Sequence, residues 1–201
     1  MKVNVLIADP PWGFSDSLKK MKKPVKRSAV SQYAVMSPAQ ISALPVQDIV
    51  DPSGCLLALW VPSSMLVQGL DVMKAWGFSL KQTFVWVKVK KKHREEADWN
   101  KSTRVGMGRL FRASHEIALI GTSGKSVYPL LEDHSQRSVA FDLNVGHSVK
   151  PPTLHERLEV MFPNAKKCEL FARRTRVSWE CLGNAVDGKD ITDAIHDLSV
   201  L

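Results

Sequence analysis

The tetrapeptide Asp9-Pro10-Pro11-Trp12 carries groups that could act on a planar base with an exocyclic amino group. The Asp9 carboxylate and the Pro10 carbonyl could each accept one amino proton, which would draw the nitrogen lone pair out of conjugation. The two prolines fix the backbone and lack amide donors, so their carbonyls are expected to face outward as acceptors. Trp12 could stack on the base. The alternative is a turn that ends a strand, with Trp12 in the core.

Residues 3–8 (VNVLIA) precede this tetrapeptide and predict a buried strand. In an open α/β sheet a ligand binds beyond the carboxyl end of such a strand. Other apolar runs predict strands over residues 55–61, 84–89, 116–120 and 167–171. Helical spacing predicts one or two turns over 38–44 and helices that begin at Ser63, at Pro151-Pro152 and at Asp190. Continuous apolar strands that alternate with helices predict an α/β fold, in which a mostly parallel sheet has helices on both faces.

The composition bounds the class of protein. The chain has 201 residues, of which 44% are hydrophobic, so one globular domain is expected and a disordered chain is excluded. Its 28 Lys and Arg against 20 Asp and Glu give a net charge of +8, which favours a polyanionic partner. The three cysteines have no C-x-x-C spacing, so we expect neither a disulfide framework nor a zinc site, and a reducing, cytoplasmic compartment fits. Neither a membrane span nor a signal peptide is expected.

The tetrapeptide matches the catalytic motif of methyltransferases that act on the N6 amino group of adenine. From about residue 3 to 191, the chain resembles adenine-N6 methyltransferases of the eukaryotic messenger-RNA writer type, a family with many compact bacterial and phage members. The further matching segments are Tyr33-Ala-Val-Met36-Ser37, Leu59-Trp60-Val61, Trp76-Gly77-Phe78, Val85-Trp86-Val87-Lys88, His115-Glu116, His147-Ser-Val-Lys150-Pro151, Glu156-Arg157-Leu158, Glu169-Leu-Phe171-Ala-Arg173 and Leu182-Gly183-Asn184.

The resemblance implies a Rossmann-like domain over residues 1–201 that uses S-adenosylmethionine, with the catalytic motif ahead of the cofactor strand in a circularly permuted order. It implies that Lys150 reaches the methionine carboxylate of the cofactor, and an ammonium suits that group. Glu169 and Arg173 could instead form a plain surface pair. No metal is expected, because the cofactor supplies the electrophile. The implied site consists of the catalytic residues Asp9, Pro10, Pro11 and Trp12, the substrate contact Tyr33, and the cofactor contacts Asp9, Lys150, Glu169, Phe171, Arg173 and Asn184.

Two basic segments, at about residues 15–31 and 90–112, are expected to flank the base pocket and to contact phosphates. A base inside a duplex must be flipped out of the stack before it is methylated, and the second segment could hold the strand meanwhile. The alternative is that such basic runs are only solvated. The expected contacts are Lys19, Lys20, Lys22 and Lys23 in the first segment and Arg104, Arg109 and Arg112 in the second.

These observations predict a monomer or homodimer that transfers a methyl group from S-adenosylmethionine to adenine N6 in nucleic acid. DNA is favoured, because the stand-alone compact relatives mostly modify bacterial or phage DNA. The alternatives are an RNA adenine methyltransferase and a catalytically inactive, nucleic-acid-binding partner subunit. Two departures from the family bear on the inactive alternative. Ala185 stands where relatives usually carry Glu or Gln, and only two residues precede the first expected strand.

Overall fold

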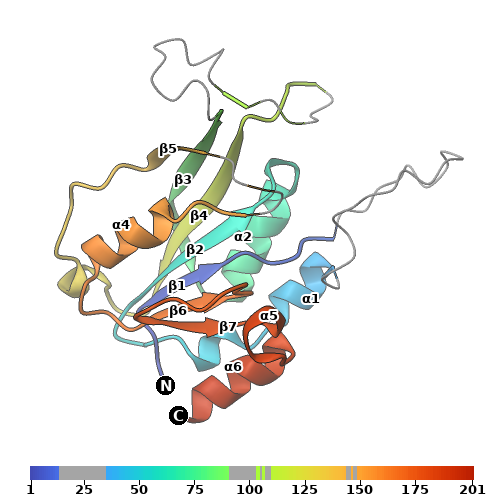
Figure 1. The fold of residues 1–201 in the computed structure, drawn as a ribbon. Coiled ribbons are helices and arrows are strands. Elements are labelled where there is room, and N and C mark those ends of the chain that lie inside the picture. The colour runs from blue at the N-terminus through green and yellow to red at the C-terminus, as the bar shows by residue number, and fades with distance from the viewer. Residues whose placement is uncertain (14–34, 91–102, 105, 107–109, 144–145, 147–148) are drawn as a thin grey trace, which may run out of the picture.

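The computed structural model describes residues 1–13, 35–90, 103–104, 106, 110–143, 146 and 149–201. Its centre is a seven-stranded sheet in the order β5-β3-β4-β2-β1-β6-β7 (Figure 1). Strand β4 is antiparallel to its neighbours β2 and β3, and the other pairings are parallel, which confirms the mostly parallel sheet. The strands are β1 (Val5–Ala8), β2 (Cys55–Val61), β3 (Ser79–Val89), β4 (His115–Ser123), β5 (Val139–Leu143), β6 (Lys167–Leu170) and β7 (Trp179–Leu182).

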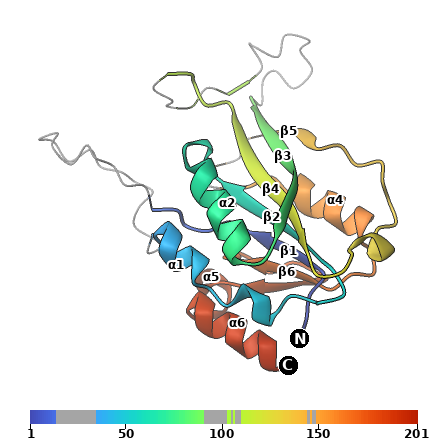
Figure 2. The same cartoon turned by 180° about the vertical axis from the view of Figure 1, so that it is seen from behind.

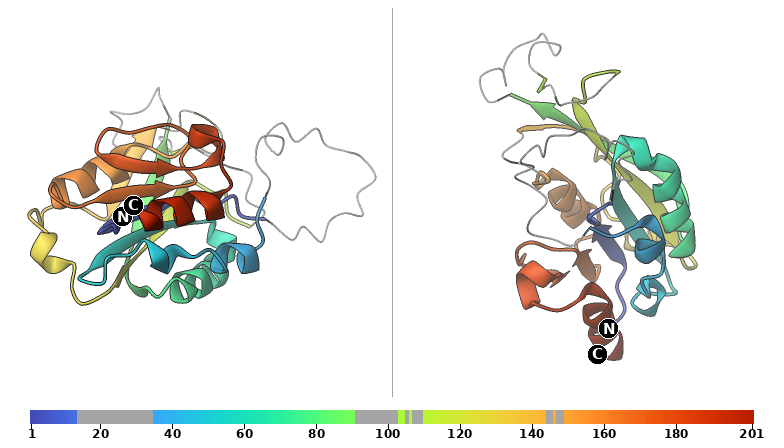
Figure 3. Two further views of the ribbon diagram at one scale, coloured as in Figure 1. Left: turned by 90° about the horizontal axis from the view of Figure 1, so that it is seen from below. Right: turned by 90° about the vertical axis from the view of Figure 1, so that its right-hand side faces the viewer.

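Helices cover both faces of the sheet, as the sequence predicts (Figures 2 and 3). One face packs against α1 (Pro38–Ser42), α2 (Leu66–Ala75) and α6 (Ile191–Val200). The opposite face packs against α4 (Thr153–Met161). The short helical elements are η1 (Val46–Asp48), η2 (Ser63–Met65), η4 (Tyr128–Leu130) and α5 (Asn184–Asp187).

Strand β1 explains why the central strands are apolar throughout. Leu6 and Ala8 belong to the hydrophobic cluster under α1, α2 and α6, whereas Val5 and Ile7 belong to the cluster under α4. All four side chains are at most 1% exposed. Because successive side chains of a strand point to opposite faces, a strand covered on both sides has no position for a polar residue.

The element boundaries follow the sequence at some positions and depart from it at others. Asp190 caps α6 as expected, since its Oδ1 accepts a hydrogen bond from the Thr192 N–H at 2.8 Å. Ser63 does not cap α2; it begins the 3₁₀ turn η2, and α2 starts at Leu66 without a side-chain cap. The sequence analysis missed β5 and β7. Both are short strands at the edges of the sheet, and each contains a charged residue that interrupts the apolar run.

Strand β1 is the point at which the order of strands in the sheet reverses: earlier connections add strands on one side of it and later ones on the other. From β1 the chain passes to β2 on one side, and it reaches β6, on the other side, only much later. These three strands are parallel, so their carboxyl ends lie at the same edge of the sheet. The segments that leave β1 and β6 therefore diverge at this edge, which is where open α/β sheets bind ligands.

No helix in the described part of the chain is long and apolar enough to cross a membrane. The three cysteines are free; Cys55 and Cys168 are buried and Cys181 is partly buried. Burial raises the pKa of each of the three thiols. Cys55 and Cys168 therefore act as apolar core side chains.

Candidate active site

Two neighbouring cavities open at the carboxyl ends of β1 and β6. The larger has a volume of about 480 Å³ and lies between the ends of β1, β6 and β7 and the helices α1 and α6. The smaller, of about 210 Å³, lies on the side of α4. Asp9, Phe171 and Arg173 line both cavities. The larger volume falls within the roughly 300–1,000 Å³ that is usual for small-molecule sites.

The expected catalytic tetrapeptide follows β1 directly, and Asp9 and Pro11 line the larger cavity. The expectation for Pro10 needs correction. Pro10 is buried, and its carbonyl oxygen already accepts the Trp12 N–H at 2.9 Å, so it is not a bare outward acceptor. The Pro11 carbonyl is engaged as well, by the Met36 N–H at 2.9 Å. Because a carbonyl oxygen has two lone pairs, each of these oxygens keeps one for a further donor.

Trp12 does not present a ring face to a ligand. Its side chain is 6% exposed and belongs to the core under α1 and α2. The indole N–H donates to the Trp60 carbonyl on β2 at 2.9 Å, so the polar end of the ring is satisfied inside the protein. The structure thus contradicts the expected stacking of Trp12 on a base and agrees with the alternative of a core tryptophan at a strand end.

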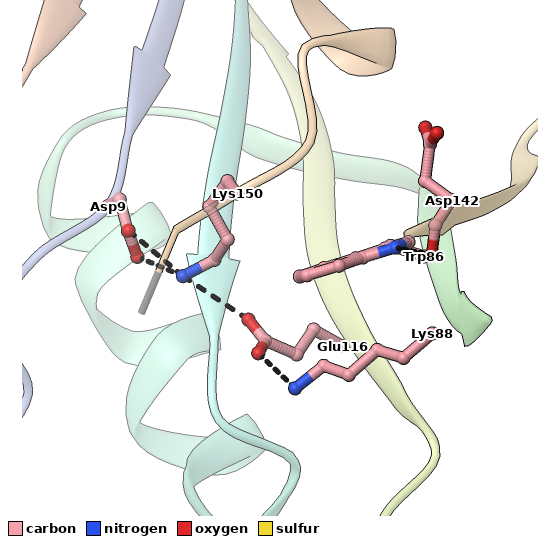
Figure 4. Close-up of polar contacts among 6 residues, drawn as sticks. All are labelled: Asp9, Trp86, Lys88, Glu116, Asp142 and Lys150. Carbon is pink, nitrogen blue, oxygen red and sulfur yellow. Dashed lines mark hydrogen bonds and ion pairs between the residues drawn. The ribbon is translucent and has the colours of Figure 1, made fainter. Parts of the chain in front are cut away.

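Lys150 connects Asp9 to charged side chains on β3 and β4 (Figure 4). Its Nζ lies 2.8 and 2.9 Å from the two carboxylate oxygens of Asp9 and 3.2 Å from Oε2 of Glu116. The other oxygen of Glu116, Oε1, lies 2.6 Å from Nζ of Lys88. Burial by itself would lower the pKa of Lys150, but the charges of Asp9 and Glu116 outweigh burial and raise it. Lys150 is therefore a largely enclosed ammonium held by two carboxylates.

Glu169, on β6, is held by two basic side chains. Nε2 of His155 lies 2.9 Å from Oε2 of Glu169, and Nε of Arg176 lies 3.2 Å from the same oxygen. Burial by itself would raise the pKa of Glu169, but these two partners hold it below its usual value. The sequence suggested Arg173 as the partner of Glu169 and gave no reason to consider His155 or Arg176.

The residue that follows β6, Phe171, has a left-handed backbone with a φ of 62°. A residue with a side chain adopts this conformation at a cost of about 1–3 kcal/mol, and such strain is concentrated at functional sites. Phe171 lines both cavities, so the strained position lies at the wall that they share.

Gly183 lets the end of β7 approach the end of β6. A Cβ atom at this position would lie 2.6 Å from the carbonyl oxygen of Ala172 and 2.8 Å from its amide nitrogen, which no side chain could occupy without a backbone shift. The close approach brings Asn184, the first residue of α5, to the wall of the larger cavity. Ala185 is exposed.

Several expected substrate contacts lie outside the described residues, namely Lys19, Lys20, Lys22, Lys23, Tyr33 and Arg109. Arg104 and Arg112 are described, and both are exposed. The N–H of Arg104 donates to the Lys88 carbonyl at 2.7 Å, which anchors this segment beside the end of β3. Neither of these two described arginines lines the larger or the smaller cavity.

The sequence analysis assigned no role to four charged side chains that contact the site: Lys88, Glu116, His155 and Arg176. A signal was present for Lys88, because it follows the apolar segment Phe84-Val-Trp-Val at a position where a further apolar residue would fit. His155 lies beside Leu154 on a helix whose buried face is otherwise apolar. No three His, Cys, Asp or Glu side chains gather in the described ranges in a way that could hold a metal ion.

Known proteins are similar to this chain over almost its whole length. A N(6)-adenosine-methyltransferase MT-A70-like protein of Drosophila melanogaster is 28% identical over 199 residues, which cover 96% of this chain and 28% of the relative. The Type II methyltransferase M.MunI of a Mycoplasma species is 26% identical, over 90% of this chain and 77% of the relative. The human N(6)-adenine-specific methyltransferase METTL4 is 26% identical, over 91% of this chain and 37% of the relative.

The chain thus spans little more than a quarter of the Drosophila relative and about three quarters of the Mycoplasma relative. The MT-A70 family model matches residues 3–185, a range that includes Asp9, Lys150, Glu169 and Asn184. The strands β1 and β6, at whose carboxyl ends the two cavities open, lie within this range. By this match, the chain belongs to the MT-A70 family.

Proposed function

We propose that the chain transfers a methyl group from S-adenosylmethionine to the N6 amino group of adenine in nucleic acid. The observation that carries the proposal is the carboxylate of Asp9 at the wall shared by two neighbouring cavities. A group at this position can contact both a methyl donor bound across the two cavities and an acceptor base placed next to the methyl group. The membership of the MT-A70 family supports the same reaction.

The larger cavity fits the cofactor in size and in chemistry. Its wall offers the Asn184 amide and the Asp9 carboxylate as polar partners, and Phe171 as an apolar surface. When bound, S-adenosylmethionine supplies an electrophilic methyl group. Lys150 remains the expected partner of the methionine carboxylate, and to bind it Lys150 would exchange one of its two contacts with Asp9 and keep its contact with Glu116. Glu169 faces the smaller cavity, so its proposed contact is with the methionine end rather than with the adenosine.

Asp9 orients the acceptor in this proposal. Its carboxylate accepts a hydrogen bond from the amino group of the adenine and directs the nitrogen lone pair toward the methyl group. The new N–C bond would form as the bond between the methyl carbon and the sulfur breaks, so that the nitrogen gains positive charge and then loses a proton to solvent. A carboxylate at hydrogen-bond distance stabilises that charge as it develops.

DNA is the favoured substrate. The compact members that the chain resembles mostly act on DNA, and the chain covers 77% of the Mycoplasma Type II methyltransferase. The human N(6)-adenosine-methyltransferase catalytic subunit METTL3, 25% identical over 199 residues, supports the RNA alternative. An inactive partner subunit is disfavoured, because Asp9 is held by Lys150 at a cavity wall rather than lost or buried.

A methyl-transfer assay on DNA and RNA oligonucleotides of one sequence tests the proposal. The expected result is label transfer from S-adenosylmethionine to adenine-containing DNA, less to RNA, and none where every adenine already carries an N6 methyl group. Asp9→Asn is the negative control. Transfer to RNA alone would favour the RNA alternative, and cofactor binding without transfer to either would favour the inactive one.

A further inference from the structure

Lys88, Glu116, Lys150 and Asp9 form a chain of alternating charges that leads to the catalytic carboxylate (Figure 4). Lys88 comes from β3, Glu116 from the neighbouring β4, Lys150 from the segment before α4, and Asp9 from the end of β1. The successive contacts are 2.6 Å, 3.2 Å and 2.8 Å long. Two ammonium groups and two carboxylates give a net charge of zero, so the loss of any one of the four charges leaves the row unbalanced.

Two buried tryptophan rings hold the ammonium groups in position. Nζ of Lys88 lies 5.1 Å from the centroid of the Trp86 ring, and Nζ of Lys150 lies 5.4 Å from the centroid of the Trp60 ring. Both rings are at most 2% exposed. The Trp86 ring is itself fixed, since its N–H donates to the Asp142 carbonyl at 3.1 Å. With the rings fixed, the carboxylates decide the direction in which the N–H groups of each ammonium point.

We infer that Glu116 is a positioning residue for the reaction and acts on Asp9 through Lys150, an inference that rests on the proposed function. An ammonium has three N–H donors, and Lys150 makes three contacts: two with Asp9 and one with Glu116. A carboxylate offers about four acceptor sites. Asp9 therefore has sites left for an amino group while Lys150 fixes its orientation.

Loss of the Glu116 charge would change the environment of Asp9 without touching it. The side chain of Lys150 is only 16% exposed, so where water has little access its third N–H would face a neutral amide oxygen instead of a charged carboxylate. The ammonium would then move toward Asp9 alone and neutralise it more completely. A carboxylate that is displaced and neutralised accepts the amino group of the substrate less well.

Glu116→Gln is the test, because it keeps the size of the side chain and removes the charge. We expect kcat to fall by about ten- to a hundred-fold, the cost of a catalytic group held slightly out of place. The Kd for S-adenosylmethionine, from calorimetry, should change by less than about two-fold. Glu180→Gln, the same change at an exposed position of β7, is the matched control and should alter neither quantity.

A double-mutant cycle separates a positioning role from a merely structural one. In a Lys150→Met background, Glu116→Gln should lower kcat by less than about two-fold further, because the side chain through which Glu116 acts is gone. Equal fractional losses in the two backgrounds would overturn the inference, since Glu116 would then act independently of Lys150.

A measurement without turnover keeps this inference distinct from the proposed function. The groups that face Lys150 are Asp9 and Glu116, and Lys88 lies beyond Glu116. The pKa of Lys150, followed by NMR of the lysine side chains, should fall in Glu116→Gln because one of its two carboxylates has lost its charge. An unchanged pKa would overturn the inference. The expected fall in a chain that methylates nothing would overturn only the proposed function.

Discussion

His155 and Glu169 join helix α4 to strand β6 through a contact of 2.9 Å between Nε2 and Oε2. An ionised carboxylate can only accept a hydrogen bond, so Nε2 of His155 is the donor in this contact. Nδ1 is buried and has no hydrogen-bond partner within the described residues. Both side chains line the smaller cavity, so this one contact fixes its wall to the helix behind it.

We expect this contact to make the stability of the protein depend on acid pH. Burial acts to raise the pKa of Glu169, but His155 and Arg176 outweigh it and hold the pKa below its ordinary value of 4.5. The stabilisation is therefore complete above pH 4.5 and is lost as the pH falls through the lowered value. In Glu169→Gln, the free energy of unfolding from urea titrations should decline less between about pH 6 and about pH 3. The same decline in both proteins would contradict this role.

Asp9→Asn should abolish methyl transfer and leave the fold intact. The amide keeps the shape of the carboxylate but loses its charge, while Lys150 retains its contact with Glu116. Asp9→Ala should be less stable than Asp9→Asn, because it removes two contacts from a largely enclosed ammonium. Single-turnover rates and thermal melting curves of the two variants measure these effects. More than about a tenth of the normal rate in Asp9→Asn would show that another group orients the acceptor.

Asn184→Ala should weaken the binding of S-adenosylmethionine. Asn184 lines the larger cavity at the start of α5, and loss of a polar partner for a buried ligand costs roughly 1–3 kcal/mol. Calorimetric titration of the cofactor measures this change. Asn164→Ala is the matched control, because the Asn164 amide is exposed and donates to Glu132 at 2.7 Å, away from both cavities. Equal affinities in the two variants would move the cofactor site elsewhere.

Neutralisation of Lys19, Lys20, Lys22 and Lys23 together should weaken binding to nucleic acid of any sequence. These residues lie outside the described part of the chain, so the prediction rests on the sequence. Each lost phosphate contact should flatten the plot of log affinity against log salt by about 0.9 on duplex DNA, or about 0.7 on single strands. Titrations at three salt concentrations decide the matter. A slope that stays the same would mean that the lysines are merely solvated, and the affinity for S-adenosylmethionine serves as the control.

The fold could be predicted from the sequence where the deciding interactions are local or repeat along one element. Strands β1 and β2 are buried on both faces, so each is visible as an unbroken apolar run, and the Asp190 cap of α6 is a local signal. The edge strand β7 lacks this signal, because it pairs with the sheet on one side only, through β6.

The sequence indicates which residues belong to the candidate site more readily than which side chains they contact there. Asp9 and Asn184, two of the expected cofactor contacts, line the same cavity. The contact between Lys88 and Glu116 depends on the register of β3 against β4, which sets Trp86 opposite Glu116. The orientation of Trp12 depends on a carbonyl of β2 that is 48 residues away. Neither relationship can be found in the spacing of residues along the chain.

Two backbone hydrogen bonds join the tetrapeptide region to Met36. The N–H of Gly13 donates to the Met36 carbonyl at 2.8 Å, and the N–H of Met36 donates to the Pro11 carbonyl at 2.9 Å. The chain therefore leaves the catalytic turn and returns to it at one point, and residues 14–34 join two ends that are already fixed. The entropy of closing such a loop changes slowly with its length. Insertions, deletions or exchange of this segment should thus leave the turn that carries Asp9 in place. If the segment contacts phosphates, as the sequence predicts, target choice and methyl transfer can diverge separately in evolution and in engineered variants.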